Sequence, residues 1–223
     1  MFKAIIIGGT GATGKQLLIQ LIRNKNCELV TSIGRRPVLY GEINDKLVDI
    51  VVESLFKLTD TEKHWKDNDV FFNCIGTTRQ RAGGAKEFIN IESGISNEAA
   101  KMAANAKIPH ASLISAKGAN HKIWAKDWIH PLLYMKTIGQ KEQTIISNFS
   151  FNSVSIFKPG MLIRLRGKQT WFEDFSELKG FGLRVDTLAS AMIHDAERVR
   201  LGLVGKSPQY FIGNKHIKSS LEL

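Results

Sequence analysis

The stretch PLLYMKTIGQK (131–141) places Tyr134, a side chain that can exchange a proton, close in sequence to Lys136 and Lys141. A free tyrosine has a pKa of about 10, so a nearby cation helps it to work at neutral pH. On a helix, Lys136 lies two residues on, about 200° round the axis, and does not face Tyr134. Lys141 returns to the same face but lies roughly 10 Å along the axis. Residue 138, one turn after the tyrosine, is isoleucine.

A glycine-rich stretch near the start, AIIIGGTGATGKQLLIQLI, predicts a dinucleotide site. Gly8, Gly11 and Gly14 follow an apolar run and open an amphipathic helix, which is the context typical of such sites. The first glycine permits a tight turn, the second lets backbone N–H groups approach a pyrophosphate, and the third lets helix and strand pack closely. The helix N-terminus favours the negative charge of the pyrophosphate. An ordinary tight turn is the less favoured alternative.

The end of the second expected strand favours NADP(H) over NAD(H). NAD sites usually place an acid about 20 residues after the glycines to bind the ribose hydroxyls, whereas arginine suits a 2′-phosphate. The sequence has Arg35 and Arg36 there and no acid before Glu42. Guanidinium groups offer forked, permanently charged donors to phosphate, although Arg36 alone is also explained as surface charge. We expect Asp49 to contact the adenine, with an acid that binds no ligand as the alternative.

The hydrophobic pattern predicts the scaffold that positions these residues. Continuous apolar or β-branched runs predict strands over 3–7, 28–33, 46–52, 69–75, 110–115 and 151–157. Helices are expected near 14–25, 54–66, 86–106, 132–148 and 185–203. This alternation predicts an α/β fold, a Rossmann-type doubly wound parallel sheet. We expect residues 1–158 to form the NAD(P)-binding core and residues 159–223 a small C-terminal substrate or lid region packed on the same domain.

Composition limits the class of protein. The 223 residues are 43% hydrophobic, which suits one large domain that needs neither disulfides nor a metal site. Cys27 and Cys74 are the only cysteines and lie in apolar stretches, which indicates buried, reduced thiols. The apolar run at the N-terminus is too short for a signal peptide or a membrane span. These features predict a soluble, cytoplasmic protein.

The formal net charge of +10 is concentrated in part of the chain, because residues 117–168 contain nine Lys or Arg and two acids. A positive face of this kind attracts anions such as nucleotide phosphates, nucleic acid or acidic protein. Nucleic acid is the less expected partner, since the chain has no zinc-finger spacing and no RNA-binding aromatic signature. A solvated basic surface without a partner explains the charge equally well.

Over nearly its whole length the chain resembles the atypical branch of the short-chain dehydrogenase/reductase superfamily, and specifically the Tat-interacting oxidoreductase family and its bacterial relatives. The resemblance implies a Rossmann-type fold, NADPH binding and an oxidoreductase framework, and some relatives are regulatory, protein-binding factors. It rests on GGTGATG, IGRR (33–36), CIGTTRQRAG (74–83), LISAKGA (113–119), FKPGML (157–162) and GNKHI (213–217).

The resemblance also implies roles for single residues at the cofactor. Arg79 is expected to face the cofactor or substrate cleft. The implied cofactor contacts are Gly8, Thr10, Gly11, Ala12, Thr13 and Gly14 for the pyrophosphate, Arg35 and Arg36 for the 2′-phosphate, Cys74, Ile75, Gly76 and Thr77 beside the adenosine ribose, and Pro159 and Gly160, with Met161 and Leu162, against the nicotinamide.

In that superfamily a serine, a tyrosine and a lysine act together, and this chain departs from the pattern. Tyr134 matches the tyrosine, which exchanges a proton with the substrate oxygen during hydride transfer. The lysine expected four residues later, which lowers the tyrosine pKa and holds the nicotinamide ribose, is Ile138. The family has two serines where this chain has Ser115 and Ala116, and the second is the usual catalytic one. Ser115 is therefore the catalytic serine that we expect, with one of the pair missing.

Residues 120–133, which precede the tyrosine, form a longer loop than in the family. They contain Trp124 and Trp128, which predict either an active-site lid or a helical turn packed on the C-terminal region, and the helical turn is favoured. His130 is an alternative acid or base. Lys117 is an alternative cation, because it follows the fifth expected strand.

The sequence as a whole predicts an NADP(H)-binding reductase that transfers hydride between NADPH and an unidentified carbonyl substrate, with Tyr134 as the proton donor. The alternative is an NADPH-sensing regulatory or protein-binding factor with a degraded catalytic site. Ile138 favours the alternative, while Tyr134 and the Pro159–Gly160 pair favour the enzyme. A nucleotide-sugar epimerase is less favoured, because the C-terminal part leaves little room for a sugar-nucleotide domain.

Overall fold

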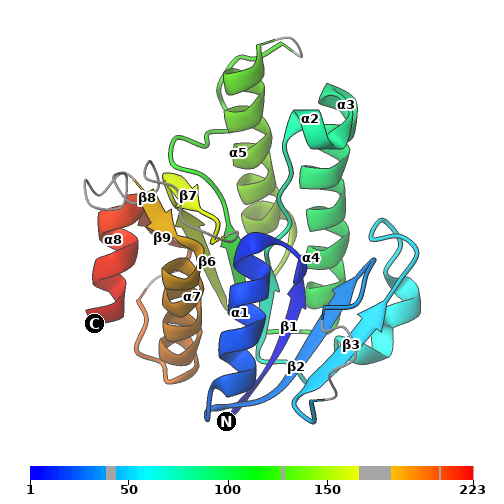
Figure 1. Ribbon diagram of the computed structural model, residues 1–223, viewed down its shortest axis with the longest axis vertical. Coiled ribbons are helices and arrows are strands. Elements are labelled where there is room, and N and C mark those ends of the chain that lie inside the picture. Colours follow the sequence, from blue (N-terminus) through cyan, green and yellow to red (C-terminus); the bar gives the residue numbers. More distant parts are fainter. Residues whose placement is uncertain (39–43, 127–128, 166–181, 206, 223) are drawn as a thin grey trace.

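Seven parallel strands form one sheet through the middle of the molecule (Figure 1). The computed structural model describes residues 1–38, 44–126, 129–165, 182–205 and 207–222. The strand order is β3-β2-β1-β4-β5-β6-β9, and every neighbouring pair is parallel. The strands are β1 Phe2–Ile7, β2 Cys27–Gly34, β3 Leu47–Val51, β4 Val70–Asn73, β5 His110–Ile114, β6 Ser153–Lys158 and β9 Gln209–Ile212.

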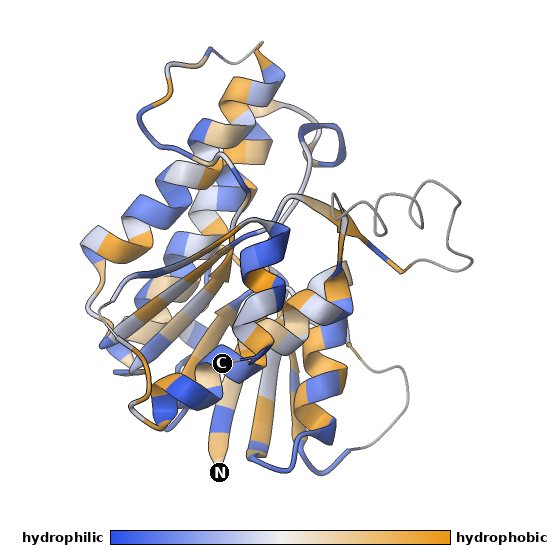
Figure 2. Ribbon diagram, turned by 90° about the vertical axis from the view of Figure 1, so that its left-hand side faces the viewer, coloured by the Kyte–Doolittle hydropathy of each residue, from blue (hydrophilic) through white to orange (hydrophobic). Residues whose placement is uncertain are grey.

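Helices cover both faces of this sheet, because each presents an apolar side to it. Helix α1 (Ala12–Arg23) packs beside α7 (Val185–Arg200) on one face, with α8 (Gly213–Ser219) next to α7 (Figure 1). On the other face lie α4 (Ser96–Asn105) and α5 (His130–Asn148). Figure 2 shows hydrophobic residues concentrated along the strands between these layers.

Shorter elements complete the described chain. A 3₁₀ helix, η1, spans Thr59–His64, and η3 spans Ser220–Glu222. Above the sheet lie α2 (Arg79–Ala82) and α3 (Ala85–Ile89), and the π-helical segment η2 (Asn90–Ile95) joins α3 to α4 (Figure 1). Strands β7 (Met161–Ile163) and β8 (Gly182–Arg184) form a separate two-stranded parallel sheet. None of the helices in the described ranges is long and apolar enough to cross a membrane.

The two faces of the sheet carry separate hydrophobic clusters. Ala4 and Ile6 point to the face covered by α1 and α7, whereas Ile5 and Ile7 point to the face covered by α4 and α5. All four side chains are fully buried. Successive residues of a strand point to opposite faces, so a strand covered on both sides is apolar throughout. This is the physical reason that the run AIII predicted a parallel strand.

The predicted α/β class with a doubly wound parallel sheet is confirmed, and all six predicted strands are present. The helix predicted over 54–66 is wrong, since only Thr59–His64 is helical and of the 3₁₀ type. There the Thr61 hydroxyl donates to the Leu58 carbonyl oxygen at 2.6 Å and accepts from Trp65 Nε1 at 2.9 Å. Side-chain bonds to local backbone compete with an α-helix in this way. The single helix predicted over 86–106 is three segments, α3, η2 and α4.

Part of the chain beyond residue 158 belongs to the main sheet. Strand β9 pairs with β6, and α7 packs against α1 in the helical layer. Neither β9 nor the small β7–β8 sheet was predicted from the sequence. The proposed boundary between residues 1–158 and 159–223 stays a prediction, while α7 and β9 join the core of the first part.

The order of the strands identifies the edge where a ligand would bind. Connections leave β1 toward β2 on one side, and the later strands start with β4 on the other side of β1. Open α/β sheets bind ligands at such a reversal, outside the carboxyl ends of the strands. The glycine loop, Arg35, Cys74, Ser115 and Pro159 each follow the carboxyl end of a strand, so the topology brings them to one edge.

Candidate functional site

The glycine loop joins β1 to α1 in a conformation that requires glycine at two positions. Gly8 has a φ of +83°, and a Cβ there would lie 2.6 Å from the carbonyl carbon and oxygen of Cys74. A Cβ on Gly14 would collide with the Gly8 carbonyl oxygen. The Gly11 N–H donates to that same oxygen at 2.9 Å, which closes the turn. The loop is therefore a cradle of bare backbone, as the close approach of a pyrophosphate requires.

The N-terminus of α1 opens into this cradle. Gly11 is the N-cap residue, and no side chain of the described residues caps the helix, so its first amides can bind a ligand. Thr10 and Gly11 are exposed and Ala12 is half-buried, as expected for residues that contact a ligand. Thr13 is 7% exposed and faces the core instead, which leaves its backbone as the part that can contact a phosphate.

Arg35 and Arg36 follow β2 directly and are both exposed. Because β2 is the neighbour of β1, they lie at the same edge of the sheet as the glycine loop. Asp49 lies inside β3 rather than after it, and its Oδ2 accepts the Val38 N–H at 2.9 Å. Asp49 thus holds the segment that follows the two arginines, and its contact with adenine stays a prediction.

The wall predicted beside the adenosine ribose, Cys74 to Thr77, follows β4. Cys74 is buried, and burial raises the pKa of its thiol to about 12, so it is not a reactive thiolate. Cys27 is buried as well, and both cysteines are free, as predicted. Ile75 and Thr77 are half-buried, and Gly76 is exposed between them. The wall contributes backbone and shape to the site rather than a reactive group.

A buried ion pair supports this wall from behind. Glu92 Oε1 accepts the Thr77 N–H at 2.5 Å, and Glu92 Oε2 lies 3.4 Å from Lys141 Nζ. Lys141 Nζ also donates to the Ile75 carbonyl oxygen at 2.8 Å. Each side chain of the pair is only 1% exposed. Lys141 therefore neutralises Glu92 and holds a loop, and it has no exposed charge to offer to a substrate.

Tyr134 lies on α5, half-buried, with its ring stacked on Phe88 of α3 at a centroid distance of 5.8 Å. Burial raises the pKa of Tyr134 above its ordinary value, Glu92 raises it further, and Arg164 lowers it. The phenol is consequently protonated at neutral pH. It is in the form that donates a proton, and Arg164 is the cation that lowers its pKa, while position 138 has no cation to make it a stronger acid.

The position four residues after Tyr134 is buried and has an apolar side chain. Ile138 is 4% exposed and is followed by Gly139, whose missing side chain lets α5 pack against the backbone of Asn120 and His121. Residues 130–148 are helical, so Lys136 does point away from the face of Tyr134. Neither Lys136 nor Lys141 replaces the missing cation.

Ser115 belongs to a second buried ion pair. Its hydroxyl donates a short hydrogen bond to Glu142 Oε1, and Lys158 Nζ lies 2.8 Å from the Glu142 carboxylate. Lys158 also donates to the Ala119 carbonyl oxygen at 3.0 Å. Ser115 is 7% exposed. The hydroxyl that was predicted to orient a substrate is thus already bonded to a carboxylate inside the protein.

Pro159 and Gly160 follow β6 at the same edge of the sheet. The Gly160 N–H donates to Asn214 Oδ1 at 2.9 Å, and the Pro159 carbonyl oxygen accepts the Lys117 N–H at 2.8 Å. Pro159 is buried, whereas Gly160 is exposed. These bonds fix the turn, because Asn214 comes from α8 and Lys117 from the loop after β5. The Lys117 side chain is exposed at this edge.

The loop before α5 differs from the favoured expectation. Residues 123–126 are not helical, and Trp124 is 65% exposed with Lys126 Nζ 5.7 Å from its ring. Trp124 therefore does not pack as a helical turn on the C-terminal region; Trp128 lies outside the described residues. His130 begins α5, and its Nε2 lies 3.1 Å from Arg79 Nη1 on the surface.

The basic segment 117–168 presents less positive charge than its sequence indicated. Lys141 and Lys158 form the two buried ion pairs, so their charges are not on the surface. Arg166 and Lys168 lie outside the described residues. Lys117, Lys122, Lys126 and Arg164 are exposed and Lys136 is half-buried.

Sequence reasoning missed the acids of both pairs, Glu92 and Glu142. A signal for Glu92 was present, because in the helix predicted over 86–106 it lies four residues after Phe88 and three before Ile95, on the same face as these apolar side chains. A carboxylate on a core-facing stripe is almost always paired. For Glu142 the signal was weaker, since Lys141–Glu142 reads equally well as a surface pair.

Comparison with known proteins identifies relatives in sequence and neighbours in fold. The mitochondrial protein FMP52 of Meyerozyma guilliermondii is 31% identical over 178 residues, which are 79% of this chain and 72% of that protein. FMP52 of Debaryomyces hansenii, also named as mitochondrial, is 36% identical over 74% of this chain and 69% of its own length. HTATIP2 of Rattus norvegicus is 31% identical over 71% of this chain and 62% of its own length. No family model matches the chain.

Solved structures agree on the fold. The oxidoreductase ylbE from Lactococcus lactis superposes with a TM-score of 0.67 at 15% identity, over 99% of this chain and 95% of that one. MoeE5 in complex with UDP-glucuronic acid and NAD gives a TM-score of 0.68 at 13% identity, over 95% of this chain and 76% of that one. At these identities the likeness concerns the fold alone.

The names of the sequence relatives correct one prediction. The chain was expected to be cytoplasmic, whereas its FMP52 relatives are named as mitochondrial. The prediction rested on two buried, reduced cysteines and on an N-terminal apolar run too short for a signal peptide. Such thiols argue against an oxidising compartment but do not distinguish one reducing compartment from another.

Proposed function

The chain belongs to the FMP52 and HTATIP2 family of atypical short-chain dehydrogenases/reductases, and from this premise we propose that it is an NADP(H)-dependent reductase of a carbonyl compound. The observation that carries the proposal is the pair of exposed arginines after β2, next to a bare glycine cradle. Asp49, whose carboxylate reaches the segment after these arginines, is bonded to the Val38 N–H. An arginine without a competing acid favours a 2′-phosphate over free ribose hydroxyls.

The residues at the edge of the sheet fit the parts of such a cofactor in order. The glycine loop and the first amides of α1 would hold the pyrophosphate, and Arg35 with Arg36 the 2′-phosphate. The wall from Cys74 to Thr77 would lie beside the adenosine ribose, and Pro159–Gly160 against the nicotinamide. When bound, the cofactor supplies a hydride for a carbonyl carbon.

The protein's own part in the reaction is a proton. Tyr134 keeps its proton at neutral pH, because its pKa is raised by burial and by Glu92. It would donate that proton to the substrate oxygen as the carbonyl is reduced, which is general acid catalysis. Reduction is the direction that this protonation state favours, since oxidation requires the tyrosine to accept a proton. Without a cation at position 138, we expect slow turnover.

A second function, an NADPH-sensing regulatory or protein-binding factor, is favoured by the buried pairs. Ser115 is bonded to Glu142, Lys141 to Glu92, and position 138 is apolar. A protein that binds the cofactor but does not transfer hydride needs no catalytic serine or lysine, so these side chains can be bonded inside the protein instead. The two functions share the dinucleotide site and differ in the fate of the hydride.

The cofactor proposal is tested by titration with NADPH and NADH at matched ionic strength. We expect NADPH to bind at least about tenfold tighter, the effect of one charge-assisted contact. Arg35→Ala and Arg36→Ala should weaken NADPH and leave NADH nearly unchanged. Arg23→Ala, at the far end of α1, removes the same charge as a control and should change neither affinity. Equal affinity for both nucleotides in the unaltered protein would contradict the proposal that Arg35 and Arg36 bind the 2′-phosphate.

The choice between reductase and sensor is tested by NADPH oxidation against a panel of aromatic aldehydes and quinones. A reductase should oxidise NADPH with at least one of them, and Tyr134→Phe should lower that rate at least about a hundredfold while NADPH affinity is kept. An unchanged rate in Tyr134→Phe would remove the proton-donor role. NADPH binding without oxidation across the panel would favour the sensor.

A further inference from the structure

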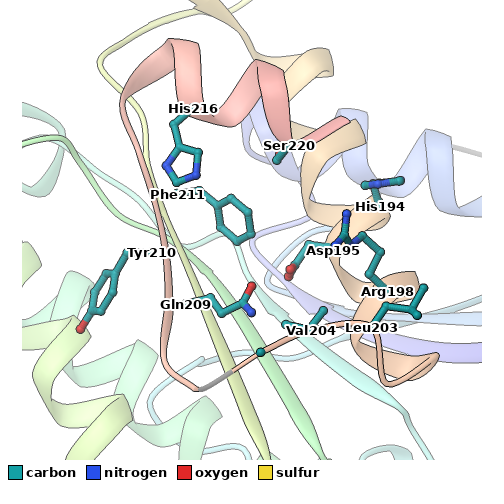
Figure 3. A pocket seen from close by; sticks show the side chains of 11 residues that line it. His194, Asp195, Arg198, Leu203, Val204, Gln209, Tyr210, Phe211, His216 and Ser220 are labelled. Carbon is teal, nitrogen blue, oxygen red and sulfur yellow. The ribbon is translucent and has the colours of Figure 1, made fainter. Parts of the chain in front are cut away.

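A cavity of about 350 Å³ lies between α7, β9 and α8, and none of the residues that we assign to the cofactor or to proton transfer lines it. Figure 3 shows the residues that surround it, which come from the second half of α7, residues 203–205, β9, α8 and the start of η3. Its size is within the range of sites for small molecules, which starts at about 300 Å³. The cavity is therefore a candidate for a ligand other than the cofactor.

Arg198 supplies the charge in this cavity. It lies in the last turn of α7, and within the described part of the chain it forms no ion pair. One of its guanidinium nitrogens, Nη1, is buried without a hydrogen-bond partner among the described residues. A guanidinium group with unused donors is a site for a planar, bidentate anion such as a carboxylate. His194 on α7 and His216 on α8 add further nitrogen donors or acceptors to the lining.

The carboxylate in the lining does not form an ion pair with Arg198. Asp195 is 4% exposed, and its Oδ2 lies 3.6 Å from Nε2 of His110, a core residue on β5. Asp195 thus contacts the strands of the sheet and forms no ion pair with Arg198, although the charge of Arg198 still lowers the pKa of Asp195. Among the described residues, the guanidinium of Arg198 is left without an ion-pair partner within 4.0 Å, and Arg198 lines the cavity.

Other residues of the lining are apolar or aromatic. Phe211 is packed on Phe157 behind it, with ring centroids 4.4 Å apart, and its ring lies 5.7 Å from that of His216. Val204 and Leu203 continue this lining, and Leu203 is 62% exposed. An apolar ligand body that covered Leu203 and Phe211 would remove that surface from water, at about 25 cal/mol for each Å².

We propose that this cavity binds a small carboxylic acid with an apolar or aromatic body, with the carboxylate on Arg198 and the body against Phe211 and Leu203. The charged residue of the lining would bind the carboxylate of such a ligand, and the apolar residues would bind its body. A free phosphate would use the cation and leave the apolar half bare, and a neutral apolar compound would leave the guanidinium unpaired.

The proposal is tested by isothermal titration of the full chain, without NADPH, using 3-phenylpropionate as the probe. We expect saturable binding of 3-phenylpropionate and binding at least about tenfold weaker for 3-phenylpropan-1-ol, 3-phenylpropylamine and inorganic phosphate. The alcohol and the amine keep the aromatic body and remove the negative charge, whereas phosphate keeps the charge and removes the body. Because no nucleotide is present, failure here leaves the cofactor proposal untouched.

Variants test each half of the lining. Arg198→Gln should weaken 3-phenylpropionate at least about tenfold, and Arg200→Gln, two residues on in α7 and absent from this lining, should not. Leu203→Ser alters an exposed side chain, so it should leave folding intact and still weaken the probe by several-fold. The proposal is overturned if no binding is seen, if the alcohol or phosphate binds as tightly as the acid, or if both Arg198→Gln and Leu203→Ser bind like the unaltered protein.

Discussion

The glycine loop and helix α5 lie at the same edge of the sheet, yet they keep the family pattern to very different degrees. The loop has every glycine that a dinucleotide site needs, and the contacts of Gly8 and Gly14 show why no other residue fits. Helix α5 keeps Tyr134 but has isoleucine at the lysine position and a protein carboxylate on the Ser115 hydroxyl. The glycine loop is constrained by backbone geometry, whereas the role of α5 depends on which partners its charged side chains have.

The charges of α5 are redirected inward by two adjacent residues. Lys141 pairs with Glu92 toward β4, while Glu142 pairs with Lys158 and Ser115 toward β5 and β6. Both pairs hold loops that follow strands, through Ile75 and Thr77 in one case and Ala119 in the other. We infer that in this chain the ion pairs of α5 stabilise the edge of the sheet on which the cofactor would lie.

The largest effect is expected from breaking one of these pairs. Lys141→Met leaves the Glu92 carboxylate buried without its partner, which typically costs about 3–5 kcal/mol of the free energy of unfolding. Urea unfolding followed by circular dichroism measures this loss. Lys136→Met, on the same helix but outside both pairs, is the control and should change stability by less than about 0.5 kcal/mol.

The double variant Glu92→Gln/Lys141→Met separates the effect of charge from that of packing. It removes both charges, so most of the stability lost in Lys141→Met should return. A loss in the double variant equal to the sum of the two single losses would show that the pair does not stabilise this edge as an ion pair.

A somewhat smaller effect is expected at the glycine loop. Gly8→Ala combines a left-handed backbone with a collision against Cys74, and we expect a loss of about 3 kcal/mol together with loss of NADPH binding. Gly83→Ala is the matched control, because Gly83 has a φ of +89° and a Cβ added there would have no atom of the described chain within 4 Å. It should lose only the backbone cost, about 1 kcal/mol. Equal losses in urea unfolding would mean that the contact with Cys74 is unimportant.

The smallest effects are expected on the ionisation of Tyr134. Glu92 raises the pKa of Tyr134, so Glu92→Gln should lower it; Arg164 lowers that pKa, so Arg164→Met should raise it. The protonated form therefore persists to higher pH in Arg164→Met and is lost earlier in Glu92→Gln. Phenolate absorbance during alkaline titration measures both shifts, with each variant compared with its Tyr134→Phe counterpart. Shifts of the same sign in the two variants would contradict this assignment of charges.

The features that the sequence predicted well are those whose cause is local. The run AIII predicts a buried strand, because a strand covered on both faces must be apolar throughout. The glycine spacing predicts the loop, because a crowded turn has no room for side chains. The 3₁₀ helix at Thr59–His64 was missed because Thr61 bonds to the backbone of Leu58, a preference that the apolar spacing does not reveal. Strand β9 was missed because it is a short edge strand with exposed Tyr210 and Ile212.

At the site itself, the sequence predicted which residues gather but not what they bond to. Ser115, Tyr134 and Pro159 reach one edge through strand order, which the strand–helix alternation predicts. The partners of the buried charges lie far away along the chain. Lys141 pairs with Glu92 at a separation of 49 residues, and Ser115 bonds to Glu142 at a separation of 27. Long-range pairing of buried charges leaves no periodic trace in one sequence, so only the folded chain shows it.

The decisive measurement is the pKa of Tyr134 in the unaltered protein and in Ile138→Arg, each obtained by phenolate absorbance against its Tyr134→Phe counterpart. Arginine stays charged throughout an alkaline titration, whereas burial would lower the pKa of a lysine at this position. We predict a pKa above about 10 in the unaltered protein. We predict a pKa lower by about one unit or more in Ile138→Arg, because a cation then lies one turn from the phenol. A pKa at or below about 10 in the unaltered protein, with no change in Ile138→Arg, would contradict the claim that this tyrosine lacks the cation of the family lysine.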